Sequence, residues 1–184
     1  DSEALAIFVN EKYGYKDKRN ILNKNISQKI DSYLADLKRK KDKGNINSFE
    51  ISDKKICFII KVENKYESYS PQEKGGSFFT YLKQIKKVNK IDIYLDSLDF
   101  DSIKLVSFFS QFIFGFNLKS YTFNKYKTLN KEKINKKINF KLISSHEKKI
   151  QKEYKYYDAI KEGVFLTRDL VSEPPNVLNP KRYT

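Results

Sequence analysis

Apolar residues along the chain fall first into short continuous runs of strand length. Runs of this kind, rich in β-branched and aromatic residues, are typical of strands buried in a sheet. They occur at Ala4–Asn10, Asn47–Ser52, Lys54–Val62, Lys90–Leu98 and Lys137–Ser144. Each run is bounded by polar or glycine-bearing segments, so the sequence predicts five strands.

Apolar residues spaced three or four apart occupy the stretches between these runs, and this spacing predicts helices. The predicted helices are centred on Ile26–Leu37, Phe78–Val88, Ile103–Phe116 and Glu147–Leu170. Gly75-Gly76 is expected to open the second helix, and Asp99 or Asp101 is expected to cap the third, which continues to Tyr121 or beyond. The most apolar segment is Ile103–Phe116 of the third helix, but its length of about 14 residues falls short of the ~20 that a membrane span needs, so a buried helix is expected.

Strands that alternate with helices predict an α/β domain in which helices flank a mainly parallel or mixed sheet. We assign residues 1–145 to this domain. Residues 146–184 form a separate unit, because they hold one long helix followed by a proline-bearing linker. In that helix we expect one buried stripe made of Ile150, Tyr154, Tyr157, Ile160 and Val164.

The charge of the chain is strongly positive, at +14 for 184 residues, which would ordinarily suggest an acidic partner. Of its 37 basic residues, however, only four are arginines. Lysine, asparagine, isoleucine, tyrosine and phenylalanine have A/T-rich codons, so the lysine excess is typical of an AT-rich genome. Specific nucleic-acid surfaces depend on the bidentate contacts of arginine, and the composition therefore disfavours such a surface.

Candidate catalytic groups are few in this sequence. Cys57 is the single cysteine and lies in an apolar run, so no internal disulfide forms and a buried strand residue is expected. His146 is the single histidine and lies in a polar segment, where a solvated residue is expected. One cysteine and one histidine cannot provide a zinc site of the usual spacing.

Two further patterns have both a chemical and a structural interpretation. The acidic cluster Asp96, Asp99 and Asp101 could hold a hard metal ion, but acids between a strand end and a helix start usually cap the helix, and we favour capping. Gly75-Gly76 could cradle a phosphate, but the wider glycine-rich context of such loops is missing. Close helix packing is therefore favoured for these glycines.

The last 22 residues, GVFLTRDLVSEPPNVLNPKRYT, begin as helix and continue into prolines. Pro174 and Pro175 cannot lie in a helix interior, and the residue before a proline is pushed towards extended backbone. The helix is therefore expected to stop near Ser172. The segment after it is expected to be a stiff, extended connector.

This segment resembles the signature of the leucyl aminopeptidase family, R-D-L-x-N-x-P-x-N-x-x-x-P followed by tyrosine, with Ser172 in place of the usual asparagine. A second stretch, FGFNLKSYTFNKYK at 114–127, resembles the family pattern G-x-x-L-x-x-Y-x-F-x-x-Y-K. The family also tends to have a Gly-Leu-Gly turn after the strand ICFII, where this chain has Lys61-Val62-Glu63. The residues matching the connector signature are Arg168, Asp169, Leu170, Pro174, Asn176, Pro180 and Tyr183. The residues matching the second pattern are Gly115, Leu118, Tyr121, Phe123, Tyr126 and Lys127.

The resemblance implies that residues 1–145 form a macro-domain-like N-terminal domain and that residues 146–184 lead towards a C-terminal catalytic domain. In the family, that domain holds two divalent metal ions, zinc or manganese, which activate water to cleave N-terminal residues from peptides. The family hallmark Asn-Thr-Asp-Ala-Glu-Gly-Arg does not occur in these 184 residues. No catalytic or metal-binding residue and no cofactor is therefore assigned to this chain, which alone is expected to be inactive.

The resemblance also implies a cytoplasmic homohexamer in which the N-terminal domain serves assembly and access to the active sites. The expected partners are the chain's own catalytic domain, other subunits and, for the full-length enzyme, peptide substrates, with no membrane partner. Two alternatives stay open: a ligand-binding macro-like module, and a basic nucleic-acid-binding domain. One continuous lysine stripe would favour the latter, and an even scatter would favour genomic composition.

Overall fold

The computed structural model describes residues 2–17, 20–41, 44–65, 67–85, 88–126, 138–175 and 177. Within these residues the chain forms a five-stranded sheet with the order β2-β3-β1-β4-β5. β2 pairs with β3 in antiparallel fashion and the other neighbours are parallel, so the sheet is mixed, as predicted. The strands are β1 Ala4–Val9, β2 Ile46–Ser52, β3 Lys55–Lys61, β4 Lys90–Tyr94 and β5 Asn139–Ile143.

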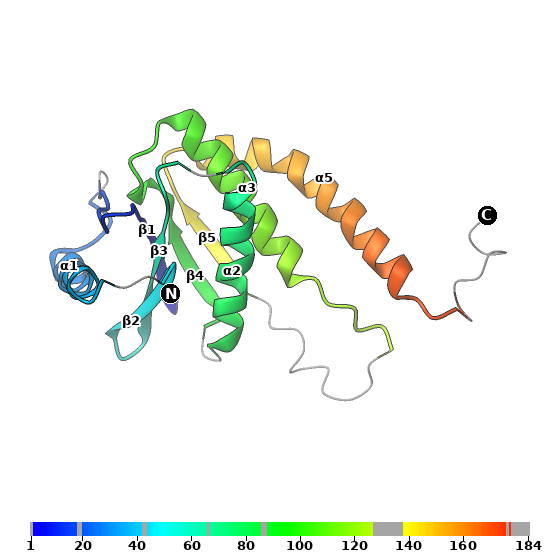
Figure 1. The fold of residues 1–184 in the computed structure, drawn as a ribbon, viewed down its shortest axis with the longest axis horizontal. Helices are drawn as coiled ribbons and strands as arrows, with labels where there is room; N and C mark the ends of the chain where they lie inside the picture. Colours follow the sequence, from blue (N-terminus) through cyan, green and yellow to red (C-terminus); the bar gives the residue numbers. More distant parts are fainter. Residues whose placement is uncertain are drawn as a thin grey trace.

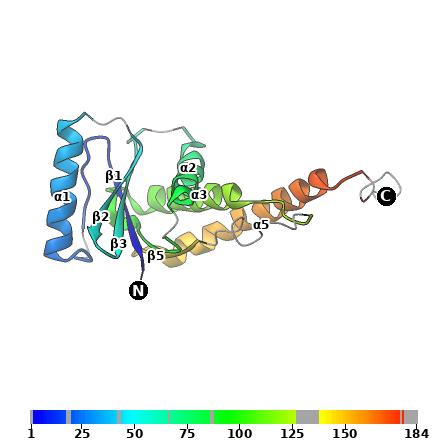
Figure 2. The same ribbon diagram turned by 90° about the horizontal axis from the view of Figure 1, so that it is seen from below.

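Helices cover both faces of the sheet, which confirms the layered α/β architecture (Figures 1 and 2). α1 (Lys24–Arg39) packs on one face. α2 (Ser70–Gln84), α3 (Ser102–Ser120) and α5 (Glu147–Ser172) lie on the other face. α5 runs past the end of α3 and projects away from the sheet, with its last turns farthest from the strands (Figure 2).

The central strand β1 shows why an uninterrupted apolar run was the correct signal for a buried strand. All six of its residues are buried. Ala4, Ala6 and Phe8 join the core beneath α2 and α3, while the alternate residues join the core beneath α1. A strand buried on both faces has no polar side, so its sequence is apolar throughout.

Phenylalanine dominates the larger core. The ring of Phe8 lies edge-on to three rings of α3, with centroid distances of 6.3 Å to Phe108, 4.7 Å to Phe109 and 5.3 Å to Phe112. Each buried ring of this kind contributes roughly 1.5–3 kcal/mol. These contacts hold α3 against the centre of the sheet, and α3 in turn supports α5.

The glycines of α2 and α3 serve close helix packing. A Cβ at Gly75 would lie 2.0 Å from the carbonyl oxygen of Phe112, and a Cβ at Gly115 would lie 1.9 Å from that of Gln72. The prediction that Gly75-Gly76 opens α2 was wrong, because α2 begins at Ser70 with Pro71 in its first turn. Proline lacks a backbone N–H, but the N–H groups of the first helical turn have no partner within the helix, so proline is well suited to this position. A glycine pair offers no such advantage at a helix start.

Other boundaries differ from the predictions in small ways. The strand expected over Lys90–Leu98 ends at Tyr94 and continues as a short 3-10 turn, η1 (Leu95–Ser97). Ser97 Oγ accepts a hydrogen bond of 2.9 Å from the backbone N–H of Phe8, so the turn closes against β1. Asp101 caps α3 by accepting from the N–H of Lys104 at 2.9 Å, while Asp99 pairs instead with Lys16.

Two apolar residues expected in buried helix faces are exposed. Ile103, in the first turn of α3, is 82% exposed, and Ile160 of α5 is 38% exposed. Ile150 is fully buried, as expected for the stripe of α5. Lys137, at the start of one predicted strand, lies outside the described residues. None of the helices in the described part of the chain is long and apolar enough to cross a membrane.

Candidate functional site

The two segments singled out in the sequence lie side by side in the structure. The chain leaving α3, at residues 118–126, contacts the last turns of α5 and the residue that follows them. The segments are about 50 positions apart in the sequence. We call this set of contacts the connector junction; it consists of Leu118, Tyr121, Lys125, Tyr126, Arg168, Asp169 and Glu173.

Arg168 and Asp169 both bind residues at the end of α3. The guanidinium of Arg168 donates a hydrogen bond of 2.8 Å to the carbonyl oxygen of Leu118, one of the carbonyls at the C-terminal end of α3 that lack a helical partner. The same guanidinium lies 5.4 Å from the centroid of the Tyr121 ring. The Tyr121 hydroxyl donates to the Asp169 carboxylate at 2.8 Å. One turn of α5 therefore caps the helix it packs against.

Glu173 receives two donors from the other segment. Lys125 Nζ lies 2.5 Å from one carboxylate oxygen, and the Tyr126 hydroxyl donates to the other. The Glu173 side chain is only 10% exposed, although Lys125 is 57% exposed. The hydrogen bonds from Lys125 and Tyr126 hold the pKa of Glu173 below its usual value, and the bond to Glu173 raises the pKa of Tyr126.

The backbone at Glu173 has the conformation that the prolines require. Its φ of −70° and ψ of 139° are extended, and α5 ends at Ser172, as predicted from Pro174 and Pro175. Glu173 therefore lies where the helix ends and the linker begins. Its two bonds to Lys125 and Tyr126 fix the direction in which the chain leaves α5.

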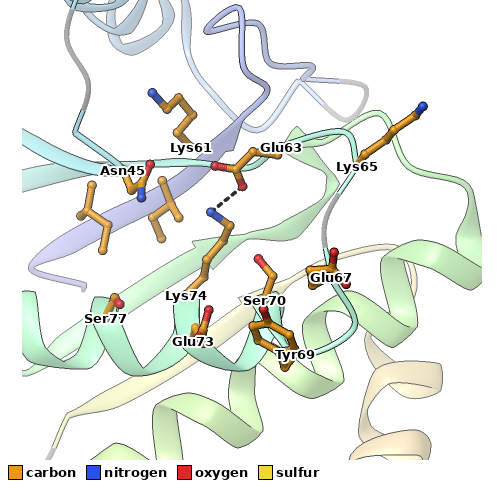
Figure 3. A pocket seen from close by; sticks show the side chains of 12 residues that line it. Asn45, Lys61, Glu63, Lys65, Glu67, Tyr69, Ser70, Glu73, Lys74 and Ser77 are labelled. Carbon is orange, nitrogen blue, oxygen red and sulfur yellow. Dashed lines mark ion pairs between the residues drawn. The ribbon is translucent and has the colours of Figure 1, made fainter.

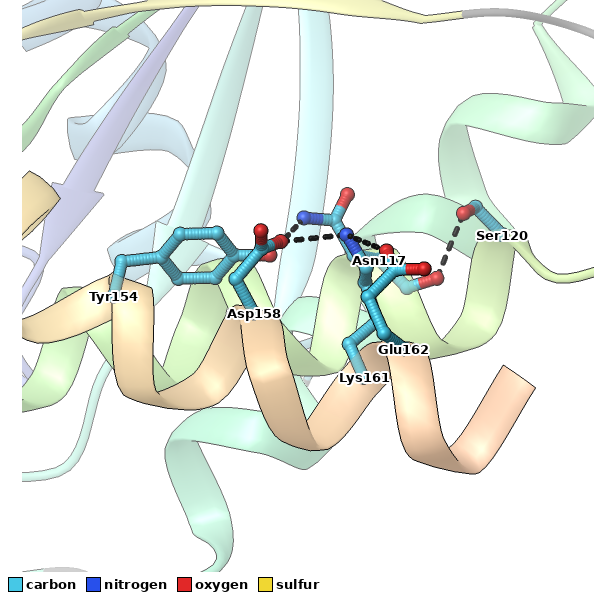
Figure 4. A network of polar contacts seen from close by, with 6 residues as sticks. All are labelled: Asn117, Ser120, Tyr154, Asp158, Lys161 and Glu162. Carbon is cyan, nitrogen blue, oxygen red and sulfur yellow. Dashed lines mark hydrogen bonds and ion pairs between the residues drawn. The ribbon is translucent and has the colours of Figure 1, made fainter. Parts of the chain in front are cut away.

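Between the sheet and the connector junction, polar side chains help to hold α5 on α3 (Figure 4). Asn117 Nδ2 donates to the Tyr154 hydroxyl at 2.6 Å. Lys161, only 17% exposed, binds Asp158 at 2.6 Å and Glu162 at 3.1 Å. At the start of α5 the buried carboxylate of Asp96 accepts from the Ser144 hydroxyl at 2.6 Å and from the Ser145 N–H at 2.7 Å. Of these contacts, the Asn117–Tyr154 bond joins α5 to α3, the pairs of Lys161 lie within α5, and the bonds of Asp96 anchor the turn before it.

The remaining predicted site residues have other positions. Gly115 lies at the crossing of α2 and α3, where it allows backbone contact. The Phe123 ring lies 5.9 Å from that of Tyr126, and Leu170 is half-buried in the last turns of α5. Pro174 accepts a hydrogen bond from the N–H of Val177 at 2.9 Å. Lys127, Asn176, Pro180 and Tyr183 lie outside the described residues.

Sequence reasoning did not find Lys125 and Glu173 as functional candidates. Lys125 occupies a variable position of the pattern, and Glu173 was noted only as the residue before a proline. The charges of these two residues were the available signal. Lys125 lies next to a matched residue of the second family pattern, and Glu173 lies next to a matched residue of the connector signature. Opposite charges at such places favour a contact between the segments.

The residues that the sequence analysis weighed as catalytic or metal-binding candidates make contacts within the fold or are buried in it. Asp96 binds the turn before α5, and Asp99 and Asp101 pair or cap as described above. His146 precedes α5, with Nδ1 at 2.9 Å from the Ser145 hydroxyl. Cys57 is fully buried, and burial raises its pKa to about 12. In the part of the chain that the structure describes, no three His, Cys, Asp or Glu side chains are grouped as a metal site would require.

A pocket of about 370 Å³ lies between the end of β3 and the start of α2 (Figure 3). Lys74 of α2 forms an ion pair with Glu63 at 2.7 Å. Glu63 belongs to the segment that stands where the family tends to have a Gly-Leu-Gly turn. Burial of the Glu63 carboxyl opposes ionisation, but the hydrogen bond from Lys74 lowers its pKa overall. Three lysines and three glutamates line the pocket, so it has no marked preference for an anion or a cation.

Comparison with curated proteins identifies probable cytosol aminopeptidases among the relatives of the chain. No protein-family model matches the chain. It is 36% identical to a probable cytosol aminopeptidase of Agrobacterium fabrum over 135 residues, which are 72% of this chain and 26% of that protein. It is 28% identical to a probable cytosol aminopeptidase of Clostridium perfringens, over 91% of this chain and 35% of that protein. The chain thus spans about a quarter to a third of the length of these curated relatives.

Solved structures show the same fold. A mutant of tomato leucine aminopeptidase superposes with a TM-score of 0.72 at 20% identity, over 98% of this chain and 37% of that protein. The bottromycin maturation enzyme BotP, in complex with Mn, superposes with a TM-score of 0.64 at 11% identity, over all of this chain and 34% of that protein. At these identities the likeness concerns the fold alone.

Proposed function

The chain belongs by homology to the leucyl aminopeptidase family, and from this premise we propose that it is the non-catalytic N-terminal domain of a cytosolic aminopeptidase. Residues 1–145 would form the domain itself, and residues 146–184 would form the connector to a catalytic domain. The proposal agrees with the short span of the match, which is 26% of the Agrobacterium fabrum relative.

The connector junction is the observation that carries this proposal. A helix that merely ended the chain would not need two carboxylates and an arginine bound at its last turns. Here Arg168, Asp169 and Glu173 all bind the segment leaving α3. Such contacts would orient a following domain relative to the sheet domain, which is the geometric requirement for a connector that frames access to an active site.

The metal ions of the full-length enzyme would be held by its catalytic domain. We propose two divalent ions there, zinc or manganese, which supply an activated water for hydrolysis of peptides at their N-terminal residue. The chain described here would contribute no ligand, because the family hallmark segment with its carboxylates does not occur in the sequence. Assembly into a homohexamer would bring several such units together.

Activity measurements test the proposal directly. The purified chain is expected to release no leucine from leucyl amide, with or without added zinc or manganese. The product of the whole gene is expected to release it in a metal-dependent way. Metal-dependent release by the 184-residue chain alone would overturn the assignment.

The reading frame after Thr184 provides a second, independent test. We expect it to continue into a segment that carries the family hallmark. A stop codon directly after Thr184 would contradict the domain assignment.

In the full-length protein, replacing both Arg168 and Glu173 by alanine is expected to lower the fraction of assembled enzyme in sedimentation, because the connector would lose its fixed direction.

The alternatives raised by the sequence have weaker support. A macro-like ligand-binding module would need a pocket with a preference for its ligand, and the pocket between β3 and α2 has balanced charges. A nucleic-acid-binding domain would need clustered arginine, and only four are present. Both therefore rank below the aminopeptidase proposal.

A further inference from the structure

A groove with an apolar floor lies between the first turns of α3 and the N-terminal half of α5. Its volume is about 740 Å³, and we call it the α3–α5 groove; its lining includes Ile103, Val106, Lys149, Lys152, Tyr156 and Tyr157. Ile103 is 82% exposed and Tyr156 is 68% exposed. Large apolar side chains gathered at one exposed place mark interaction sites more often than isolated ones do.

The exposed Tyr156 lines the groove, beside the place where α5 packs on α3. The helix is held to α3 through Tyr154, which bonds Asn117, and through Tyr157, whose ring lies 5.3 Å from that of Phe114. Tyr156 takes part in neither of these contacts, and a Cβ at Gly163, two turns further on, would have no atom within 4 Å. The packing of this domain therefore leaves one side of α5 uncovered.

Two lysines of α5, Lys149 and Lys152, line the groove. Lys148, Lys149, Lys152 and Lys155 are exposed on α5, and none of them has an ion-pair partner among the described residues. The nearby acids are Glu153, which lines the groove, Glu147, which accepts from Gln151, and Asp101, which caps the first turn of α3 beside Ile103. Positive charge therefore exceeds negative charge around an apolar floor.

We propose that the α3–α5 groove docks an acidic amphipathic helix of a partner protein. Apolar side chains of such a helix would cover Ile103 and Tyr156, and its carboxylates would meet the lysines of α5. Two parallel walls formed by helices suit a third helix, which presents anchors at positions i, i+3, i+4 and i+7. The charges would speed association and select the partner.

Two other occupants fit the groove less well. A second copy of the chain would present the same lysine-bearing groove, so it would offer no surplus of carboxylates to Lys149 and Lys152 there. A nucleic acid would find no arginine in the lining and an apolar floor that no phosphate can use. The groove takes no part in the connector junction, so its test is independent of the aminopeptidase assignment.

Fluorescence anisotropy with a synthetic peptide tests the proposal. The probe is a fluorescein-labelled 18-residue helix of Glu, Ala and Leu, with the leucines on one face. A peptide of identical composition with the leucines scattered is its control, and both are titrated with the 184-residue chain at about 0.15 M salt, where the Debye length is about 8 Å. We expect saturable binding of the amphipathic peptide, at least about tenfold tighter than that of the control peptide.

Variants locate the binding. Ile103→Asp places a charge on the apolar floor at a position already exposed, so the fold is retained, and we expect at least about tenfold weaker binding. Lys149→Glu with Lys152→Glu is expected to weaken it similarly. The matched control, Lys24→Glu with Lys54→Glu, makes the same charge change at two exposed lysines outside the groove and is expected to change affinity less than about twofold.

Several outcomes would overturn the proposal. They are equal binding of the scattered peptide, absence of saturable binding, an unchanged affinity in Ile103→Asp, or an equal loss in the Lys24/Lys54 control. Sedimentation without peptide adds one more: self-association that Ile103→Asp abolishes would identify a second copy as the occupant and reject an acidic partner.

Discussion

At the scale of single residues, the glycines show that one residue type can have opposite energetic roles. Gly115 lies where α3 crosses α2, and a Cβ there would be 1.9 Å from the carbonyl oxygen of Gln72. Gly163 lies on the open side of α5, with nothing within 4 Å of an added Cβ. The first glycine permits packing, whereas the second only lowers the helix propensity of its segment.

Replacing Gly115 by alanine is therefore expected to destabilise the fold. The added methyl group would overlap a backbone carbonyl, which cannot rotate away as a side chain can, so α2 and α3 must separate. Overpacking of this kind costs about 1–3 kcal/mol and occasionally more. Thermal unfolding followed by circular dichroism should show a midpoint lower by roughly 2–4 °C for each kcal/mol.

Gly163→Ala is the matched control for that measurement. The new methyl group meets no neighbour, and alanine is the better helix former by about 0.8–1.0 kcal/mol. We expect an unchanged or higher midpoint. An equal loss of stability in both variants would show that backbone contact at the helix crossing is not the cause.

At the scale of elements, the sequence predicted those strands and helices that are marked by a continuous apolar run or by apolar residues at helical spacing. β1 was predictable because both of its faces are buried, and the end of α5 was predictable because prolines forbid helix after Ser172. The start of α2 was missed because glycines inside a helix look like a break until the partner helix is known. The contact between Lys125 and Glu173 was also missed, since it depends on how α5 lies along α3, and no local pattern encodes that.

The contact at Glu173 should control order at the end of α5. Its pKa is lowered by the bonds from Lys125 and Tyr126, so the stabilisation is present above the ordinary carboxylate range and is lost as the pH falls through the lowered pKa. Glu173→Gln removes the charge at pH 7 and imitates that loss. We expect hydrogen exchange of the amides of Phe165–Ser172 to become faster by a factor of roughly two to five, the size expected for an ion pair whose lysine is exposed.

Glu162→Gln is the control on the same helix. Glu162 is 70% exposed, and Lys161 keeps Asp158 as a partner when Glu162 is neutral. We expect exchange at Phe165–Ser172 to stay unchanged in this variant. Equal acceleration in both variants, or none in Glu173→Gln, would contradict the role assigned to the connector junction.

At the scale of the whole molecule, the positive charge is spread over both sides of the sheet. Exposed lysines occur on α1 at Lys24 and Lys38, in the β2–β3 turn at Lys54, and on α5, which packs on the opposite face. A nucleic-acid-binding surface would concentrate them on one side. The scatter agrees with genomic composition as the source of the lysine excess, although α5 has a local concentration.

The chain is accordingly expected to bind duplex DNA weakly and without sequence preference. Lysine acts as a point charge that contacts phosphates and carries little information about bases. We expect a dissociation constant of about 10⁻⁴–10⁻⁶ M at physiological salt, with a steep loss of affinity between roughly 50 and 200 mM salt. Anisotropy with two labelled duplexes of unrelated sequence measures both properties.

Because the binding would depend on total charge, Lys24→Glu with Lys54→Glu should weaken it about as much as Lys149→Glu with Lys152→Glu, and Ile103→Asp should change it less than either. Tight binding that distinguishes the two duplexes at physiological salt would contradict this account and would rank a nucleic-acid function above the aminopeptidase proposal.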